Sequence, residues 1–245
     1  MTNELLESVN LRDFLDPKYH ILEKFRELAP GSDKHCQNVM ALCESVAMDL
    51  GMSSDVIKVA ARYHDIGKMN NPEAYSENQN GSNIHDNLDP MISYQLITRH
   101  VGDSILYLLQ IENMPKKVLE IISQHHGNTI LRFFYDKSGA KIENIYRYKC
   151  EQPTSLEAAI LMICDVIEAT ARSLSINGQL DKTPDRTSVV NKSIQRLMDD
   201  GQLDNMKVGE LKVVKKTLTR EMESIYHKRV VYGDEKEIGT SNSIV

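Results

Sequence analysis

Residues 61–68 read ARYHDIGK, and this short stretch determines which architecture and which chemistry we expect. His64 lies near the end of a predicted helix, in line with Ile57 and Ala61, so we expect its imidazole to face the core. An acidic neighbour, Asp65, follows where that helix ends. A lone core histidine is usually hydrogen-bonded to the protein, so this pair indicates a site only if partners come from other helices.

Two further polar side chains are predicted to point at the same core. His35, on a helix expected over residues 32–50, shares a stripe with Val39 and Val46. Asp165 lies inside the apolar run LEAAILMICDVIEA, with no lysine or arginine within one helical turn. Burying an unpaired carboxylate costs several kcal/mol, so Asp165 needs a cation, a metal ion or a proton. A hydrogen-bonded structural aspartate is the alternative, but imidazoles and carboxylates from separate helices are typical ligands of divalent metals in a bundle core.

Three more histidines extend this set. His125 and His126 close a helix predicted over 115–125, and His100 ends another. Two adjacent histidines are seldom a core feature, because neutral imidazoles still need partners, although His126 could simply face solvent. The candidate ligands for two metal ions, with Asp65 shared between them, are His35, His64, Asp65, His100, His125, His126 and Asp165.

The composition of the 245 residues favours a helical globular protein. Hydrophobic residues make up 41% of the chain, with no Trp and 4 Phe against 11 Met, which suits helices packed by flexible aliphatic side chains. A net charge of −6 argues against binding a nucleic-acid polymer, which needs a basic face. No apolar run approaches the length of a membrane span, and the N-terminus lacks the pattern of a secretory signal. The four cysteines lack disulfide-type spacing, so we expect a cytoplasmic protein with reduced thiols.

Two irregular segments interrupt the helical pattern. Residues 70–89 are rich in Asn, Ser, Pro and Gly, and a loop of this length is usually functional or disordered. Residues 127–153 lack periodicity but carry five aromatic side chains, so we interpret them as an ordered flap. We predict an all-α bundle with a helical extension over 1–30, one domain over 31–232 and a polar, flexible tail over 233–245. Helices are predicted over 32–50, 53–67, 90–99, 103–111, 115–125, 154–174, 187–200 and 208–229.

The order of these motifs resembles the HD superfamily of metal-dependent phosphohydrolases. The HDIGK form is similar to the cytosolic HD domain of the seven-transmembrane HD phosphodiesterases, the PgpH type, which hydrolyse cyclic di-AMP. The similarity covers residues 21–232 through the segments ELAPGSDKH, ARYHDIGKMNNPEAYSENQNGSNIHDNLDP, TRHVGD, ISQHHGNT, FFYDK, MICDVIEATARSL and YHKRVVY. It implies an HD-domain helical bundle that acts as a metal-dependent phosphodiesterase.

The resemblance also implies a role for each matching residue. One metal ion would be held by His35, His64 and Asp165, the other by His100, His125 and His126, with Asp65 bridging them. The family typically uses iron or manganese, and the substrate would be a small-molecule cyclic dinucleotide opened to linear pApA. Asp65 and Lys68 would act in catalysis, Lys68 through its charge beside the substrate phosphate. Arg172 would support the phosphate or the carboxylates; a solvated Lys68 and a purely structural Arg172 are the alternatives.

Some features depart from the family and keep other hypotheses open. The residues around His35, GSDKHCQN, differ from the usual Gly-Thr-Tyr-His-His-Ser pattern. The family is usually membrane-anchored, so this chain is either a free-standing relative or one domain of a membrane protein. The tripeptide Gly-Tyr-Pro of cyclic di-GMP enzymes does not follow the histidine pair, which disfavours that substrate. Competing readings are an HD phosphohydrolase acting on another nucleotide or phosphate ester, a non-catalytic dinucleotide-binding module, and a bundle whose histidines are incidental.

Overall fold

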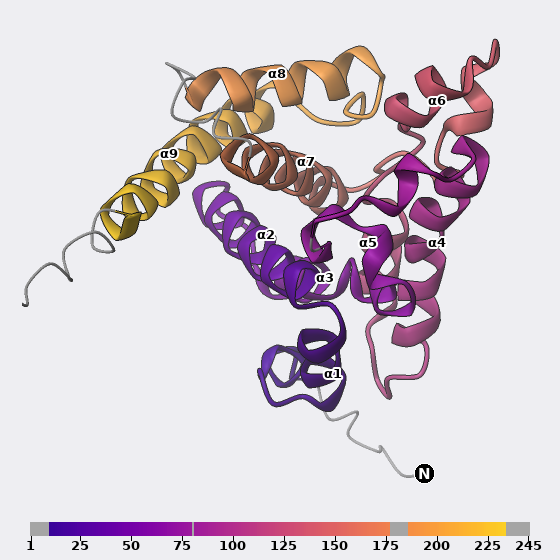
Figure 1. Cartoon of the computed structure of the whole chain (residues 1–245). Coiled ribbons are helices and arrows are strands. Elements are labelled where there is room, and N and C mark those ends of the chain that lie inside the picture. Colours follow the sequence, from indigo (N-terminus) through magenta and orange to yellow (C-terminus); the bar gives the residue numbers. More distant parts are fainter. Residues whose placement is uncertain (1–9, 80, 177–185, 234–245) are drawn as a thin grey trace, which may run out of the picture.

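Helices account for all regular structure in the part of the chain described by the computed structural model, residues 10–79, 81–176 and 186–233, with side chains described up to residue 222 (Figure 1). Within these ranges the only β pairing is an isolated bridge between Ile130 and Arg147. The predicted all-α class is therefore confirmed. The helices are α1 His20–Leu28, α2 Pro30–Asp49, α3 Asp55–Tyr63, α4 Pro90–Leu108, α5 Lys116–Ser123, α6 Arg132–Ser138, α7 Leu156–Ile176, α8 Arg186–Asp199 and α9 Val208–Gly233. Short 3-10 turns are η1 Asp13–Leu15, η2 Ile66–Asn70, η3 Pro72–Ala74, η4 Ser76–Asn78, η5 Ile84–Asp86 and η6 Glu143–Tyr146.

Helix α7 forms the centre of the bundle. Its first half is apolar on every side, and a helix of that kind is stable only when neighbours cover it all round. It packs against α2, α3, α5 and α8, and in Figure 1 it lies between α8 on one side and α2 on the other. The side chains from Ile160 to Cys164 are fully buried. Asp165 follows directly and is also buried, as the sequence predicted, but its carboxylate points to histidines of other segments and not to apolar side chains.

Several helix boundaries differ from the prediction. The predicted helix over 53–67 ends at Tyr63, and α6 lies in the segment 127–153, where no helix was predicted. Helix α2 begins at Pro30, two residues before the predicted start, because proline suits the first position of a helix, where its missing N–H is not needed. The predicted helices over 90–99 and 103–111 are one continuous helix, α4. Gly102, which lies in the gap between the two predicted helices, is inside α4. A helical glycine costs only about 1 kcal/mol, and the packing of α4 on α5 and η2 outweighs it.

A close contact at Gly67 fixes η2 against α4. A Cβ atom added at Gly67 would lie 2.3 Å from the carbonyl oxygen of His100 and 2.5 Å from the backbone nitrogen of Ser104. The Gly67 N–H donates to the Ser104 hydroxyl at 2.9 Å, and that hydroxyl donates to the His64 carbonyl at 2.8 Å. These contacts hold the end of α3 against the middle of α4, so Asp65 and His100 face each other.

The polar segment 70–89 is folded through the turns η3, η4 and η5, apart from residue 80, which lies outside the described residues. Asn78 ties it to α2, because its side-chain oxygen accepts from the backbone N–H of Gly31 at 2.9 Å and of Ser32 at 3.2 Å. The Tyr75 hydroxyl donates to the Leu96 carbonyl at 3.1 Å on α4. The segment is thereby fixed between two helices, which places Glu77 beside the start of α2.

The segment 127–153 is ordered, as predicted for a flap. Its aromatic residues form a second, smaller core with α4, made of Tyr94, Ile130, Phe134 and Tyr146. Arg147 also joins the segment to α8 through two hydrogen bonds to the Asp200 carboxylate, at 2.7 and 3.1 Å. Phe133 does not anchor the flap, since its side chain is 62% exposed.

The chain ends lie largely outside the described residues. The predicted tail over 233–245 falls there beyond Gly233, as do the first nine residues of the predicted extension over 1–30. The division into extension, domain and tail therefore stays a prediction. Among the described helices, none combines the length and the hydropathy needed to cross a membrane.

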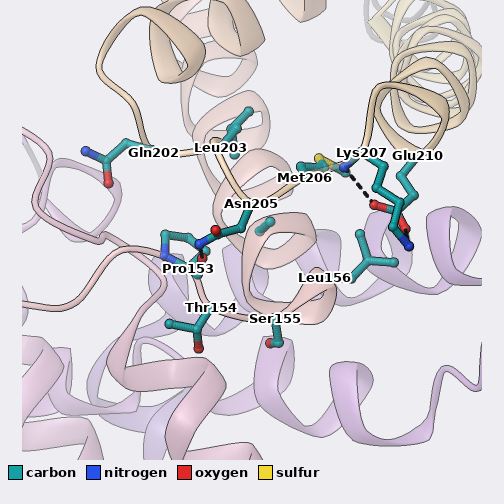
Figure 2. A pocket seen from close by; sticks show the side chains of 11 residues that line it. Pro153, Thr154, Ser155, Leu156, Gln202, Leu203, Asn205, Met206, Lys207 and Glu210 are labelled. Atoms are coloured by element: carbon teal, nitrogen blue, oxygen red, sulfur yellow. Dashed lines mark hydrogen bonds and ion pairs between the residues drawn. The ribbon is translucent and has the colours of Figure 1, made fainter.

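A small cavity of about 170 Å³ lies where the start of α7 meets the connection between α8 and α9 (Figure 2). Asn205 crosses its edge and donates to the Pro153 carbonyl at 3.1 Å, and the Lys207 N–H donates to Glu210 at 3.0 Å. None of the seven candidate metal ligands lines this cavity.

Candidate metal centre

The seven predicted ligands, which come from five separate segments, converge in the middle of the bundle. Their donor atoms form two groups, and within each group the atoms lie within 4.8 Å of one another. The first group is His35, His64 and Asp165, and the second is Asp65, His100, His125 and His126. These are the groupings that the family resemblance implied. Cys36 can form a third combination with His64 and Asp65, which the sequence did not suggest.

Asp65 lies between the two groups. Its Oδ2 atom is 3.3 Å from His64 Nε2 and 3.6 Å from His35 Nε2. The other oxygen, Oδ1, is 3.3 Å from His100 Nε2 and 4.0 Å from His125 Nε2. Each carboxylate oxygen therefore faces a different set of imidazoles, which is the arrangement that a carboxylate bridging two cations requires.

Three of the imidazoles are oriented by their own helices. The Nδ1 atoms of His64, His100 and His125 lie 2.8, 2.6 and 2.6 Å from the carbonyl oxygen three residues earlier in the chain. Because a carbonyl only accepts, each Nδ1 must carry the proton and donate it. In the neutral tautomer the Nε2 lone pair is then free, and it points toward Asp65. A hydrogen bond of this kind from the non-ligating nitrogen is typical of metal-binding histidines.

His35 is oriented by a carboxylate instead. Its Nδ1 atom lies 2.5 Å from Glu168 Oε2, and its Nε2 atom lies 2.9 Å from Asp165 Oδ1. Asn38 donates to the other oxygen of Glu168 at 2.8 Å. Glu168 was not among the predicted site residues, although a second acid three residues after Asp165 on the same apolar helix was a usable signal.

His126 differs from the other histidines in its exposure. Its side chain is 20% exposed, and its ring stacks on Tyr148 with the centroids 4.4 Å apart. The Nε2 atom nevertheless lies 3.1 Å from His100 Nε2, and Nδ1 lies 3.7 Å from Asp165 Oδ2. His126 thus lies at the solvent side of the second group, and its two ring nitrogens face other candidate ligands and not only solvent.

Lys68 and Arg172 contact the same set of carboxylates. Lys68 Nζ lies 2.6 Å from Asp65 Oδ2 and 2.7 Å from Glu77 Oε1, so it is not a solvated loop lysine. Arg172 lies 3.5 Å from both Glu77 and Glu168. Burial opposes the charge of Glu77, but Lys68 and Arg172 together lower its pKa to about 2. Glu77 was not predicted, because it lies in the segment 70–89, which has no periodicity to orient a side chain.

The electrostatics differ between the two groups. In the second group, burial and the charges of neighbouring imidazoles lower the pKa of His125 to about 3 and that of His126 well below its usual range. Those imidazoles are therefore neutral, which is the form that binds metals. In the first group, burial is overcome by hydrogen bonds to Asp165 and Glu168, which raise the pKa of His35 to about 10. That group attracts positive charge strongly.

The donor set fits divalent metal ions. Two buried polar atoms aimed into the centre, His64 Nε2 and Asp65 Oδ1, have no hydrogen-bond partner. Leaving such an atom unsatisfied costs about 1–3 kcal/mol, and a cation between the groups would remove that cost. Imidazole nitrogens with carboxylate oxygens are ligands that suit first-row transition metals.

Comparison with known proteins identifies similar HD domains. The family model of the HD domain matches residues 33–170 of this chain. The cyclic-di-AMP phosphodiesterase PgpH of Listeria monocytogenes is 34% identical over 240 residues, which cover 95% of this chain and 33% of that protein. This chain thus spans about a third of the length of the curated relatives it matches.

Solved structures of the Listeria monocytogenes PgpH HD domain are also similar to this chain. One has a TM-score of 0.77 at 33% identity and covers 85% of this chain and 100% of that one. Another, in complex with cyclic di-AMP, has a TM-score of 0.75 at 32% identity and covers 84% of this chain and 97% of that one.

Proposed function

The chain belongs to the HD-domain family, and from this we propose that it is a two-metal phosphodiesterase that hydrolyses cyclic di-AMP to linear pApA. The observation that carries the proposal is Asp65, whose two oxygens face two separate groups of metal-binding side chains. The choice of substrate is supported by the similar PgpH HD domain, whose structure contains cyclic di-AMP.

In this proposal each group holds one ion. The first ion is assigned to His35, His64 and Asp165, the second to His100, His125 and His126, and Asp65 bridges them. Iron or manganese is the expected metal because the resemblance to the family implies it, and mixed imidazole and carboxylate ligands are compatible with both. When bound, two such ions activate water as the nucleophile and neutralise charge on the attacked phosphodiester.

The basic side chains act on the substrate from the loop side. Lys68 sits beside Asp65, so its ammonium group is in reach of a phosphate oxygen bound at the metals. Glu77 holds Lys68 in place from the other direction, and the Lys68 ammonium also lies 4.8 Å from the centroid of the Tyr75 ring. Arg172 contacts two carboxylates, Glu77 and Glu168, so we assign it a positioning role through them.

Turnover by metal-loaded protein tests the proposal. Protein loaded with Mn²⁺, or anaerobically with Fe²⁺, is incubated with cyclic di-AMP, cyclic di-GMP or pApA, and products are separated by chromatography beside a metal-free control. We expect pApA to form from cyclic di-AMP only when metal is present. A protein that holds two metals but cleaves none of these would instead be an HD phosphohydrolase with another phosphate-ester substrate. If that protein still binds cyclic di-AMP tightly, it would be a non-catalytic binding module.

We predict that Glu168→Gln weakens metal binding at the first group. The amide keeps the shape of the side chain but loses the charge that orients His35 and raises the basicity of its imidazole. Loss of such a partner costs roughly 10–100-fold in metal affinity or activity. The readouts are metal content by mass spectrometry and kcat at saturating metal. Glu157→Gln on the same helix is the matched control, and Glu168→Asp should restore part of the loss. Equal metal content in wild type and Glu168→Gln would contradict this role.

A further inference from the structure

A cleft of about 670 Å³ opens beside the metal centre. It is bounded by the flap segment 129–132, by Val166 on α7 and by the side of α8 that faces them. His126, the most exposed of the seven candidate ligands, lines one end of it. Tyr148, which stacks on His126, lines it as well. The cleft is therefore continuous with the open side of the second metal group.

The lining combines an apolar wall with unpaired positive charge. Ile130, Leu131 and Leu197 contribute to the wall. Lys192 and Arg196, one turn apart on α8, are exposed, and their side chains make no ion pair or hydrogen bond to any residue in the described part of the chain. A solvated helix face would look the same in the sequence, but here both side chains border a cleft that ends at a metal site.

The other charged side chains of the cleft have partners. Arg132 pairs with Glu143 at 2.8 Å, and Asp200 pairs with Arg147 at 2.7 Å. The Asp199 carboxylate accepts a hydrogen bond from Gln195 at 2.7 Å. Because Gln195 is neutral, the lining keeps two cations without an opposite charge, Lys192 and Arg196, and one such carboxylate, Asp199, so its net charge is positive and matches an anionic ligand.

The size of the cleft suits a nucleotide. Small-molecule sites are typically clefts of about 300–1,000 Å³, whereas a single phosphate needs far less room. A larger cavity of about 750 Å³ borders α4 and Tyr148, but none of the seven candidate ligands lines it, and its Arg99 is paired with Asp103 at 3.0 Å. None of the seven candidate ligands lines the small cavity of Figure 2 either. Only the cleft at His126, among these three, joins the metal centre.

We propose that this cleft binds the second nucleotide of a dinucleotide substrate, with Lys192 and Arg196 contacting the phosphate that is not cleaved. The nucleobase would lie against the apolar wall formed by the flap and α8. The inference rests on the proposed function. If one phosphodiester of the dinucleotide lies at the two metals, the other nucleotide must bind elsewhere, and this cleft is next to the metals.

The test compares two substrates in the metal-loaded full chain. Cyclic di-AMP has a second nucleotide, whereas bis(p-nitrophenyl) phosphate offers one phosphodiester and nothing for the cleft. For the double variant Lys192→Gln/Arg196→Gln we expect the KM for cyclic di-AMP to rise about tenfold, because two exposed charged contacts are lost. The kcat for cyclic di-AMP and all constants for bis(p-nitrophenyl) phosphate should stay unchanged. Lys116→Gln/Lys117→Gln on α5 removes the same charge away from the cleft and is the matched control.

The outcomes separate the cleft from the proposed function. If the wild type cleaves cyclic di-AMP and the α8 double variant keeps the wild-type KM, the cleft assignment is wrong and the function stands. An equal loss on both substrates, or an equal loss in the α5 control, would also overturn the cleft assignment. If the wild type binds cyclic di-AMP without cleaving it, the Kd replaces the KM and the same comparison decides. A wild type that neither cleaves nor binds cyclic di-AMP overturns both proposals.

Discussion

Replacing Asp65 by asparagine is expected to reduce kcat by on the order of 10³-fold or more, since two-metal charge stabilisation is worth several kcal/mol. Both oxygens of this carboxylate face candidate ligands, so one substitution disturbs both groups at once. The asparagine amide keeps one acceptor and places a donor where the other oxygen was. The measurements are steady-state turnover of cyclic di-AMP and the metal content of the purified variant.

The fold should survive this change. Lys68, which loses one carboxylate partner, still has Glu77 at 2.7 Å. Circular dichroism of the variant should therefore match the wild type, and Asp55→Asn, an exposed substitution at the start of α3, serves as the control for turnover. Wild-type turnover by the Asp65→Asn variant, confirmed by its mass, would falsify the assignment of Asp65 as a bridging ligand.

Gly67→Ala is expected to lower the free energy of unfolding by about 3 kcal/mol, near the upper end of typical overpacking costs. The added methyl group would lie 2.3 Å from the His100 carbonyl oxygen and 2.5 Å from the Ser104 nitrogen. Because these are backbone atoms, the clash cannot be relieved by a rotamer change, and η2 must move away from α4. Urea unfolding followed by circular dichroism measures the loss. Turnover should fall as well, since Asp65 and His100 separate.

Gly102→Ala is the matched comparison on α4 itself. A Cβ atom there meets nothing within 4 Å, so the substitution should stabilise the helix by about 0.5–1 kcal/mol through the lower conformational freedom of alanine. If both variants unfolded at the same urea concentration, the inference that η2 and α4 are in tight contact would be wrong.

The sequence alone predicted those features of the site that follow from helical periodicity. His35, His64 and Asp165 each lie on or beside a regular helix, so their inward direction follows from the spacing of their apolar neighbours. The convergence of the seven candidates could then be inferred from the motif order, which resembles that of the HD family. The spacing of apolar residues did not predict that α4 is continuous from Arg99 to Asp103, because the packing of α4 on α5 and η2 has no signal within the helix itself.

The residues that were missed share a different property. Glu77 reaches Lys68 because Asn78 fastens an irregular loop to α2, a long-range contact with no local signature. In the sequence, Lys192 and Arg196 belong to an ordinary polar helix face. Only the structure shows that the flap lies opposite them across a cleft. Glu168 could have been noticed, yet its partner nitrogen on His35 lies 133 positions earlier in the chain. Such pairings depend on how distant segments meet, which spacing within one helix does not encode.

The hydrogen bonds from the Nδ1 atoms of His64, His100 and His125 to carbonyls three residues before them have a thermodynamic consequence. Fixing a mobile side chain in a complex costs about 0.5–1.5 kcal/mol of rotational entropy. Here that entropy is lost when each helix forms, before any ion arrives. An ion bound at these nitrogens would not have to offset that cost, so the affinity for any cation that fits the donors would be higher. Three short peptide segments would thus contribute to metal affinity in advance, because each sets the direction of one donor nitrogen.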